Sequence, residues 1–460
     1  MRCGTRPCRR ASRWRDWGRV SRPVPCVPTR PLPGGAPRGP SGEPVRLRSA
    51  RGERGWRTLD LVSAAAIRRA AERLQPVLQP TPVEGSRALS EVLGGEVVLK
   101  CENLQRTGSF KLRGAYNRIA LLSDAERAGG VVCASAGNHA QGVALGSALQ
   151  GVDATVFMPV SAPLPKVAAT QAYGATVELV GETFDEALAA ARSYADERGR
   201  VFVHPFDHPD VIAGQGTIAL ELLAQVPSFA TVLVPVGGGG LISGMAVALR
   251  AERPDVRIVG VQASGAASFP ASLTAGEPTT LAAVDTIADG IAVKRPGELT
   301  LAHVRELVDE VVTVDDDVIA RAVVLLLERA KLVVEPSGAA AVAAILAGGV
   351  ELAAPVVAVL TGGNIDPLLM QHLVTSGLTA EGRYVTLRTR IPDRPGELAR
   401  LLELAADARA NVVGVEHHRF GRRLRLGQVE VVVELETRGA DHVAELCRTM
   451  QRAGYPVSTV

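Results

Sequence analysis

Residues 131–149 read VVCASAGNHAQGVALGSAL and place an apolar run, a polar loop and a helical stretch in direct succession. The apolar run, Val131 to Cys133, is typical of a buried strand, and a helix is expected over residues 141–149. A strand that leads directly into a helix predicts a parallel α/β sheet, in which ligands bind beyond the carboxyl ends of the strands. The loop between them, residues 135–139, is therefore a candidate binding site.

The same alternation continues on both sides of this stretch. Further apolar runs predict buried strands at residues 154–158, 176–180, 201–203, 231–236, 258–261 and 356–360. Helices are expected at residues 166–173 and 184–198. Right-handed crossovers between parallel strands would place helices on both faces of each sheet.

Two more unusual loops follow apolar strands. Residues 237–241 are Gly237, Gly238, Gly239, Gly240 and Leu241, and the absent side chains would let backbone N–H groups approach a phosphate closely. Ser243 replaces the third glycine of a G-x-G-x-x-G motif, and the Lys-Ser/Thr of a P-loop is missing, so both nucleotide-binding interpretations lose support. The other loop begins at Thr361. Either loop, taken alone, could be an ordinary tight turn.

Lysine is scarce in this chain. Of its 51 basic residues only five are lysines, at positions 100, 111, 166, 294 and 331. Arginine cannot replace a Schiff-base amine, whereas a buried lysine can lose its proton near neutral pH. Lys100 and Lys331 are expected to have solvated tips. Few candidates for covalent chemistry remain, and one of them is Lys111, in the stretch Ser109-Phe110-Lys111-Leu112-Arg113-Gly114.

Six ordered motifs resemble those of the fold type II pyridoxal-phosphate (PLP) enzymes, and within them the threonine dehydratases (threonine ammonia-lyases) with their serine-dehydratase and serine-racemase relatives. The motifs are ENLQRTGSFKLRGA at 102–115, SAGNHAQGVA at 135–144, VPVGGGGLISG at 234–244, ADGIAV at 288–293, VEPSGAAAVAA at 334–344 and TGGNID at 361–366. The resemblance covers residues 58–380. It implies two open, mainly parallel twisted sheets with helices on both faces and a small subdomain at about 133–207.

The resemblance also implies a role for each matching position. Lys111 would carry PLP as a Schiff base and move the substrate proton, with Phe110 packed near the ring. Asn138 would hydrogen-bond the ring hydroxyl, and Gly237 to Leu241 would hold the phosphate. Thr361 stands where the family usually has a serine beside the pyridine nitrogen. Its neutral hydroxyl suits elimination, because the leaving group itself takes up the electron pair.

The substrate carboxylate is expected to bind at Ser135, Ala136, Gly137, Asn138 and His139. The implied reaction is β-elimination, which converts threonine to 2-oxobutanoate and ammonia, or serine to pyruvate and ammonia. A racemase would need an acid or base on the opposite face, and the resembling racemases have a serine where this chain has Ala136. Ala136 therefore favours a lyase.

Other functions stay open at this stage. They are a serine dehydratase or serine racemase, a catabolic threonine deaminase, a β-replacement transferase such as a cysteine synthase, and a purely regulatory amino-acid-binding protein. The sequence does not decide between threonine and serine, because one methyl group changes discrimination by only about 1–3 kcal/mol. A monovalent or divalent cation near Gly265 and Ala266 is left unassigned, because Gln262 replaces an acidic residue often found on that strand in the relatives.

The C-terminal segment, residues 383–460, predicts a separate βαββαβ module that resembles an ACT domain. Strands are expected at 384–391, 412–418, 428–436 and 456–460. One helix is expected to open at the turn 393–398, with Pro395 near its first turn, and to run to about Ala410, and another is expected at 440–452. The turn with Asp393, Gly396 and Leu398 lies where ACT domains bind amino acids at subunit interfaces. We expect a homodimer or homotetramer, a branched-chain amino-acid effector, and a regulated step of isoleucine biosynthesis. A dimerisation module without an effector is the alternative.

Charge and composition set the N-terminus apart. Residues 1–57 hold 15 Arg against Asp16, Glu43 and Glu53, so their net charge is +12 and that of the remainder is −9, within a total of +3. This Pro- and Gly-rich tail is expected to be disordered, as a dispensable start, a targeting leader or a nucleic-acid arm. No apolar run reaches the roughly 18 residues of a membrane span. Scattered cysteines without metal-ligand spacing favour the cytoplasm. We expect neither nucleic acid nor membrane as a partner.

Overall fold

The computed structural model describes residues 45–46, 60–419 and 424–459. Most of the tail predicted to be disordered lies outside these residues. Two of its residues, Val45–Arg46, form a short edge strand, β1.

The larger of two α/β sheets has the strand order β1-β10-β9-β8-β11-β3-β2. Its other strands are β2 Val83–Gly85, β3 Val97–Cys101, β8 Thr231–Pro235, β9 Arg257–Ala263, β10 Glu310–Val314 and β11 Val356–Leu360. The five inner strands are parallel, and only the edge strands β1 and β2 pair antiparallel. The predicted parallel architecture is confirmed for this sheet.

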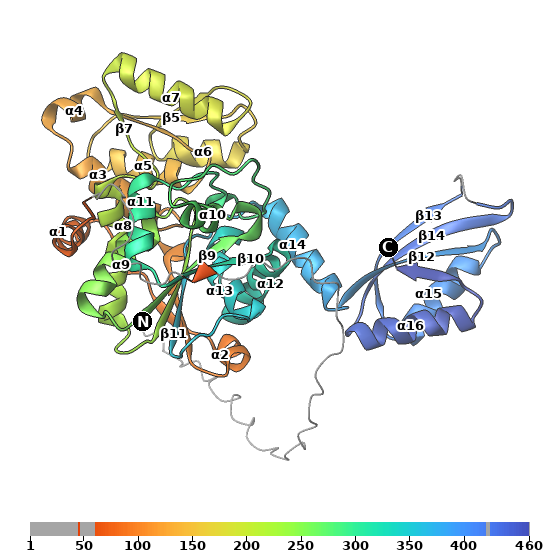
Figure 1. Ribbon diagram of the computed structural model, residues 1–460. Helices are drawn as coiled ribbons and strands as arrows, with labels where there is room; N and C mark the ends of the chain where they lie inside the picture. The colour runs from red at the N-terminus through yellow and green to blue at the C-terminus, as the bar shows by residue number, and fades with distance from the viewer. Residues whose placement is uncertain (1–44, 47–59, 420–423, 460) are drawn as a thin grey trace, which may run out of the picture. The chain divides into compact units, whose positions relative to one another are not determined.

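Helices cover both faces of the large sheet (Figure 1). One apolar core lies under α1 Ala64–Leu74, α8 Pro209–Gln225, α9 Gly240–Glu252 and α11 Glu298–Leu307. The opposite core lies under α2 Arg87–Leu93, α12 Asp316–Leu325, α13 Pro336–Ala347 and α14 Pro367–Ala380. Shorter segments are α10 Ser268–Ala275, the π-helical η4 Leu326–Ala330, and the 3-10 turns η1 Glu102–Leu104, η2 Ser264–Ala266 and η3 Asp289–Ile291.

The smaller sheet has four parallel strands in the order β6-β5-β4-β7. They are β4 Val131–Ala134, β5 Ala154–Met158, β6 Thr176–Leu179 and β7 Val201–Phe202. The helices around it are α3 Lys111–Ala120, α4 Asp124–Gly129, α5 Asn138–Ala148, α6 Leu164–Ala172 and α7 Phe184–Arg198. The prediction that residues 176–180 form a buried strand is wrong: β6 is an edge strand, and most of its side chains are exposed.

Helix α8 connects the parts of the fold that matter for the site. It packs against both α3, which begins at Lys111, and α9, which begins at Gly240. Glycines permit this close approach. A Cβ on Gly214 would lie 2.6 Å from the Arg113 carbonyl oxygen, and a Cβ on Gly244 would lie 2.2 Å from the Ile212 carbonyl oxygen. The distance between the lysine and the glycine loop is therefore set by helix packing rather than by flexible loops.

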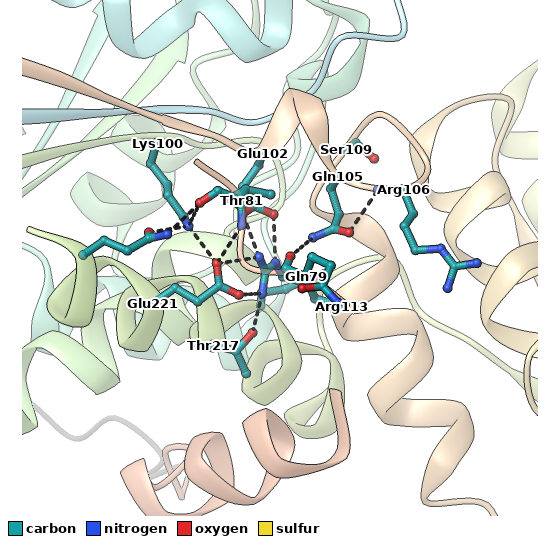
Figure 2. Close-up of polar contacts among 12 residues, drawn as sticks. Gln79, Thr81, Lys100, Glu102, Gln105, Arg106, Ser109, Arg113, Thr217 and Glu221 are labelled. Atoms are coloured by element: carbon teal, nitrogen blue, oxygen red, sulfur yellow. Dashed lines mark hydrogen bonds and ion pairs between the residues drawn. The ribbon is translucent and has the colours of Figure 1, made fainter. Parts of the chain in front are cut away.

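A buried network of charges surrounds Arg113, two residues after Lys111 in the sequence (Figure 2). Arg113, only 1% exposed, donates two hydrogen bonds of 2.8 Å to the carboxylate of Glu102. It also donates to Glu221 at 2.6 and 3.0 Å. The prediction of a solvated tip for Lys100 is wrong, because its side chain is fully buried and its Nζ donates to Glu221 at 2.7 Å. The network pairs two cations with two carboxylates, so burial leaves no unbalanced charge.

The C-terminal unit has the predicted βαββαβ order. Its elements are β12 Tyr384–Pro392, α15 Glu397–Asp407, β13 Asn411–His418, β14 Gln428–Glu436, α16 Ala440–Arg452 and β15 Val457–Thr459. The four strands form one antiparallel sheet in the order β13-β14-β12-β15. Alternate residues of β12 and β14 point into a separate core with Leu401 and Leu446 from the two helices.

Candidate active site

A cavity of about 720 Å³ opens at the carboxyl ends of strands from both α/β sheets. The residues predicted for covalent, cofactor and substrate contacts all line it: Phe110, Lys111, Ser135, Ala136, Gly137, Asn138, His139, Gly237, Gly238, Gly239, Gly240, Leu241 and Thr361. The structure thus brings together four segments that are far apart in the sequence. This convergence follows from the topology, since parallel strands end at a common edge.

Lys111 is the first residue of α3 and its side chain is held in place inside the cavity. Its Nζ donates to the carbonyl oxygen of Pro205 at 3.1 Å and lies 5.2 Å from the centre of the Phe110 ring. Burial lowers the pKa of the Lys111 amine from 10.5 to about 8, although the carboxylate of Glu335 opposes this shift. A substantial share of the amine is therefore neutral, and nucleophilic, near physiological pH.

The loop at residues 135–139 turns β4 into α5. Ser135 Oγ accepts a hydrogen bond from the Gly137 N–H at 3.1 Å. The ring of His139 is buried, and its Nε2 lies 2.9 Å from the Val203 carbonyl oxygen. Burial lowers the pKa of His139 to about 3, so the ring is neutral and Nε2 donates to that carbonyl. His139 therefore fixes the loop and does not act as an acid or base near neutral pH.

The glycine loop is shaped by what packs behind it. A Cβ on Gly238 would lie 2.3 Å from the ring of Phe206, and a Cβ on Gly240 would lie 2.9 Å from the Phe206 carbonyl oxygen. Gly239 has a φ of +90° and precedes the first residue of α9. The N–H groups at the start of a helix have no intrahelical acceptor, so this loop presents donors suited to a phosphate.

Thr361 lies at the tip of β11 and is only 4% exposed. Its carbonyl oxygen accepts a hydrogen bond from the Phe110 N–H at 3.2 Å, which ties this strand tip to the lysine segment. The hydroxyl lies 3.5 Å from the Ser337 carbonyl oxygen. The only groups that this side chain can offer to a ligand are a neutral donor and acceptor.

Three residues of the cavity were not singled out in the sequence. Pro205 offers its carbonyl oxygen to Lys111, while Glu335 and Asn364 hold the amide of Asn138. Glu335 and Asn364 stand inside the motifs at 334–344 and 361–366, and Asn364 follows a strand tip. The position of Asn364 after a buried strand was the available clue, whereas Glu335 precedes a helix, and the contact of both with Asn138 depends on tertiary packing.

His204, which lines the same cavity, accepts hydrogen bonds from backbone N–H groups. His204 Nδ1 accepts from the Asp207 N–H at 2.8 Å and the Phe206 N–H at 3.3 Å, as expected for a loop-stabilising residue. Asp207 in turn accepts from the Thr300 N–H at 3.0 Å, in the first turn of α11. These bonds hold Phe206 beneath the glycine loop.

In the region near Gly265 that was considered for a cation, polar groups form hydrogen bonds within the protein. Gln262 is fully buried, with Nε2 donating to the Val236 carbonyl oxygen at 3.2 Å and Oε1 accepting from the Phe269 N–H at 2.9 Å. The Gly265 carbonyl oxygen accepts from the Asp285 N–H. Within the described ranges, no group of three or more His, Cys, Asp or Glu side chains could hold a metal ion.

The residues predicted for an effector lie in the ACT-like unit, at the start of α15. Asp393 forms an ion pair of 3.4 Å with Arg419, and its N–H donates to the Gly427 carbonyl oxygen. Gly396, with a φ of +89°, precedes α15, and Leu398 packs against the core of this unit. The three residues share one turn, as the motif predicts.

Comparison with known proteins agrees with this geometry. A family model described as pyridoxal-phosphate dependent enzyme matches residues 74–362. A Geobacter sulfurreducens protein named L-threonine ammonia-lyase is 49% identical over 395 residues, which are 86% of this chain and 98% of that protein. The processed form of threonine deaminase isoform 2 from Solanum lycopersicum is structurally similar, with a TM-score of 0.66, 36% identity, and coverage of 74% of this chain and 93% of that one. Maize serine racemase has a TM-score of 0.66 and 37% identity, over 70% of this chain and 99% of that one.

Proposed function

Because the chain belongs to the family of pyridoxal-phosphate dependent enzymes, we propose that it deaminates L-threonine to 2-oxobutanoate and ammonia. One observation about the cavity supports this proposal most directly. A buried lysine with a lowered pKa lines the same cavity as a glycine loop suited to a phosphate and a helix start suited to a carboxylate. L-serine, which lacks only one methyl group, is expected to be a second substrate that gives pyruvate.

The residues of the cavity fit the cofactor. Side chains at Gly238 or Gly240 would fill the space now taken by Phe206, so the glycine loop can only present backbone. Because the pKa of the Lys111 amine is lowered to about 8, part of this amine is unprotonated near neutral pH and can form a Schiff base with an aldehyde. Thr361 offers a neutral hydroxyl rather than a charge. When bound, the cofactor supplies an electron sink for the charge that develops at the substrate Cα.

Residues of the chain bind the substrate and move its proton during elimination. N–H groups of the loop at 135–139 bind and orient the substrate carboxylate, since they lie at the start of α5. Lys111 Nζ, held by Pro205, takes the proton from the substrate Cα. The Phe110 ring lies next to the Lys111 amine, and the Phe206 ring packs against the glycine loop.

Racemisation is the second candidate, because the fold is also that of maize serine racemase. The cavity wall at position 136 carries the methyl group of Ala136, which cannot carry a proton. The chain therefore favours loss of the β-hydroxyl over return of the proton from the other face.

The experiment is a substrate panel with the purified full-length holoenzyme. L-threonine, L-serine and D-serine are tested for 2-oxo acid and ammonia, and unreacted serine is analysed for its chirality. Equal amounts of 2-oxobutanoate and ammonia from L-threonine support the proposal. Inverted serine without oxo acid would identify a racemase, and no product from any of the three would refute both functions.

Regulation, assembly and location are part of the same proposal. The βαββαβ unit and its Asp393 to Leu398 turn support an amino-acid effector bound between subunits of a homo-oligomer. Isoleucine and valine, added to the panel, test this, and sedimentation with and without them tests the assembly. Cys101 and Cys133 are free and buried, in keeping with a cytoplasmic enzyme. Among the residues that the structure describes, no helix has the length and apolarity needed to span a membrane.

Capture of PLP by the apoenzyme is expected to follow the protonation of Lys111. The neutral amine is the nucleophile, so the rate should rise with pH to a midpoint near the pKa of about 8, well below the ordinary lysine value of 10.5. Stopped-flow absorbance between about pH 6 and pH 10 measures the rate. Lys111→Ala, which has no amine at this position, is the control, and a midpoint above pH 10 in the unmodified protein would contradict the description of this lysine.

Gly238→Ala is expected to weaken PLP binding by at least about tenfold, or 1.4 kcal/mol. The added methyl group would meet the Phe206 ring at 2.3 Å, so either the ring or the loop must move. Gly85→Ala is a matched control, because a Cβ there meets no atom within 4 Å. Equilibrium dialysis of each apoenzyme with PLP measures the two affinities. If Gly238→Ala and Gly85→Ala bound PLP equally well, the loop at Gly238 would not contact the cofactor.

A further inference from the structure

The amide of Asn138 is held from two sides. Its Nδ2 donates to Glu335 Oε1 at 2.6 Å, and its Oδ1 accepts from Asn364 Nδ2 at 2.7 Å. Asn364 Nδ2 also donates to the Thr107 carbonyl oxygen at 2.7 Å, so both of its hydrogens are used. The orientation of the Asn138 amide is therefore fixed, and one of its N–H groups is left for a ligand in the cavity.

Glu335 is built into the large-sheet side of the cavity. It is 5% exposed and immediately precedes α13, and its N–H donates to the Gly362 carbonyl oxygen at 3.0 Å. A Cβ on Gly362 would lie 2.2 Å from Glu335 Oε1 and 3.0 Å from Asn138 Nδ2. The glycine at this strand tip thus leaves the space that the Glu335–Asn138 pair occupies.

Charged groups from three other elements face Glu335. Asp289 comes from η3, Lys166 from α6 and Lys111 from α3, and the first two form an ion pair of 2.8 Å. Burial and then Asp289 raise the pKa of Glu335 to about 7, against the opposing effects of Asn138 and the two lysines. At the pH where Lys111 loses its proton, Glu335 is largely a carboxylate.

We propose that Glu335 is a positioning residue of this reaction centre, which orients Asn138 towards the cofactor and supplies a negative charge to the cavity that also contains Lys111. The two roles have different requirements. Orientation needs only an acceptor for the Asn138 N–H, whereas the influence on Lys111 needs the charge itself. The proposal rests on the proposed function only in that Lys111 captures PLP.

Glu335→Gln and Glu335→Leu separate these roles. Glutamine keeps an acceptor but no charge, so PLP affinity should stay within about threefold of the unmodified protein. The midpoint of the pH dependence of PLP capture should fall by roughly half a unit or more, because the carboxylate that favours the protonated lysine is gone. Leucine also removes the acceptor, so affinity should fall by at least about tenfold as well.

The measurements are made on the apoenzyme of the full chain, with PLP itself as the probe. Glu351→Gln, the same change at an exposed position, is the matched control and should alter neither quantity. If Glu335→Leu fails to fold, as judged by thermal unfolding, Glu335→Gln still carries the test. An unchanged or higher midpoint in Glu335→Gln overturns the proposal, as does leucine binding PLP like the unmodified protein. Neither readout needs turnover, so a failure of the proposed reaction would be seen separately in the substrate panel.

Discussion

Lys111→Ala is expected to lower the rate of 2-oxobutanoate formation from L-threonine by at least about a thousandfold. The substitution removes both the group that bonds to the cofactor and the base for the substrate Cα proton. Lys111→Arg should be equally inactive, since arginine keeps a positive charge but does not form the bond. Initial rates of oxo acid formation measure the loss.

Lys294→Ala is the control for this prediction. Lys294 also lines the cavity, but its Nζ is paired with Asp185 at 3.0 Å and its side chain is half exposed. Its removal should change the rate only severalfold. Turnover by Lys111→Ala at the rate of the unmodified protein would show that another group carries the chemistry.

Arg113→Leu is expected to lower the free energy of unfolding by about 3–5 kcal/mol. Burial disfavours the charge of Arg113, but the carboxylates of Glu102 and Glu221 outweigh burial and raise its pKa. Leucine would leave Glu102, which is fully buried, without its cation. Urea unfolding of the apoenzyme, followed by far-ultraviolet circular dichroism, measures the change, because all three tryptophans lie in residues 1–57.

Arg87→Leu provides the comparison for Arg113. Arg87 and Glu91 form an ion pair of 2.8 Å, but their side chains are 93% and 63% exposed. Its loss should cost less than about 1 kcal/mol. If both substitutions had similar small effects, the buried network around Arg113 would not stabilise this part of the fold.

Local pattern was sufficient for most of the fold. The strands at residues 154–158 and 356–360 and the helix at 184–198 have the predicted bounds, because each is a continuous apolar run or a capped amphipathic segment. β6 was misjudged, since its apolar residues resemble those of an inner strand although it lies at an edge. Whether a strand is central or at an edge depends on neighbours that a local window does not contain.

The site could be predicted where chemistry and topology coincide. The glycine loop follows from its residue type and its place after a buried strand, whereas Lys111 was chosen among five lysines by the resemblance of its motif. The burial of Lys100 could not be predicted, because its partner Glu221 is 121 residues away in the sequence and reaches it only through the packing of α8. The same holds for Glu335, which lies 197 residues from Asn138. Such pairs are brought together by tertiary structure, whereas a sequence motif identifies only one residue of each pair.

The central claim is that Lys111 carries the cofactor. Reduction of the full-length holoenzyme with borohydride, followed by proteolysis and mass spectrometry, locates the attached phosphopyridoxyl group directly. With only five lysines in the chain, the assignment is unambiguous. The account predicts the label on Lys111 alone. A label on Lys166 or Lys294, which also line the cavity, or no label on any lysine, would contradict it.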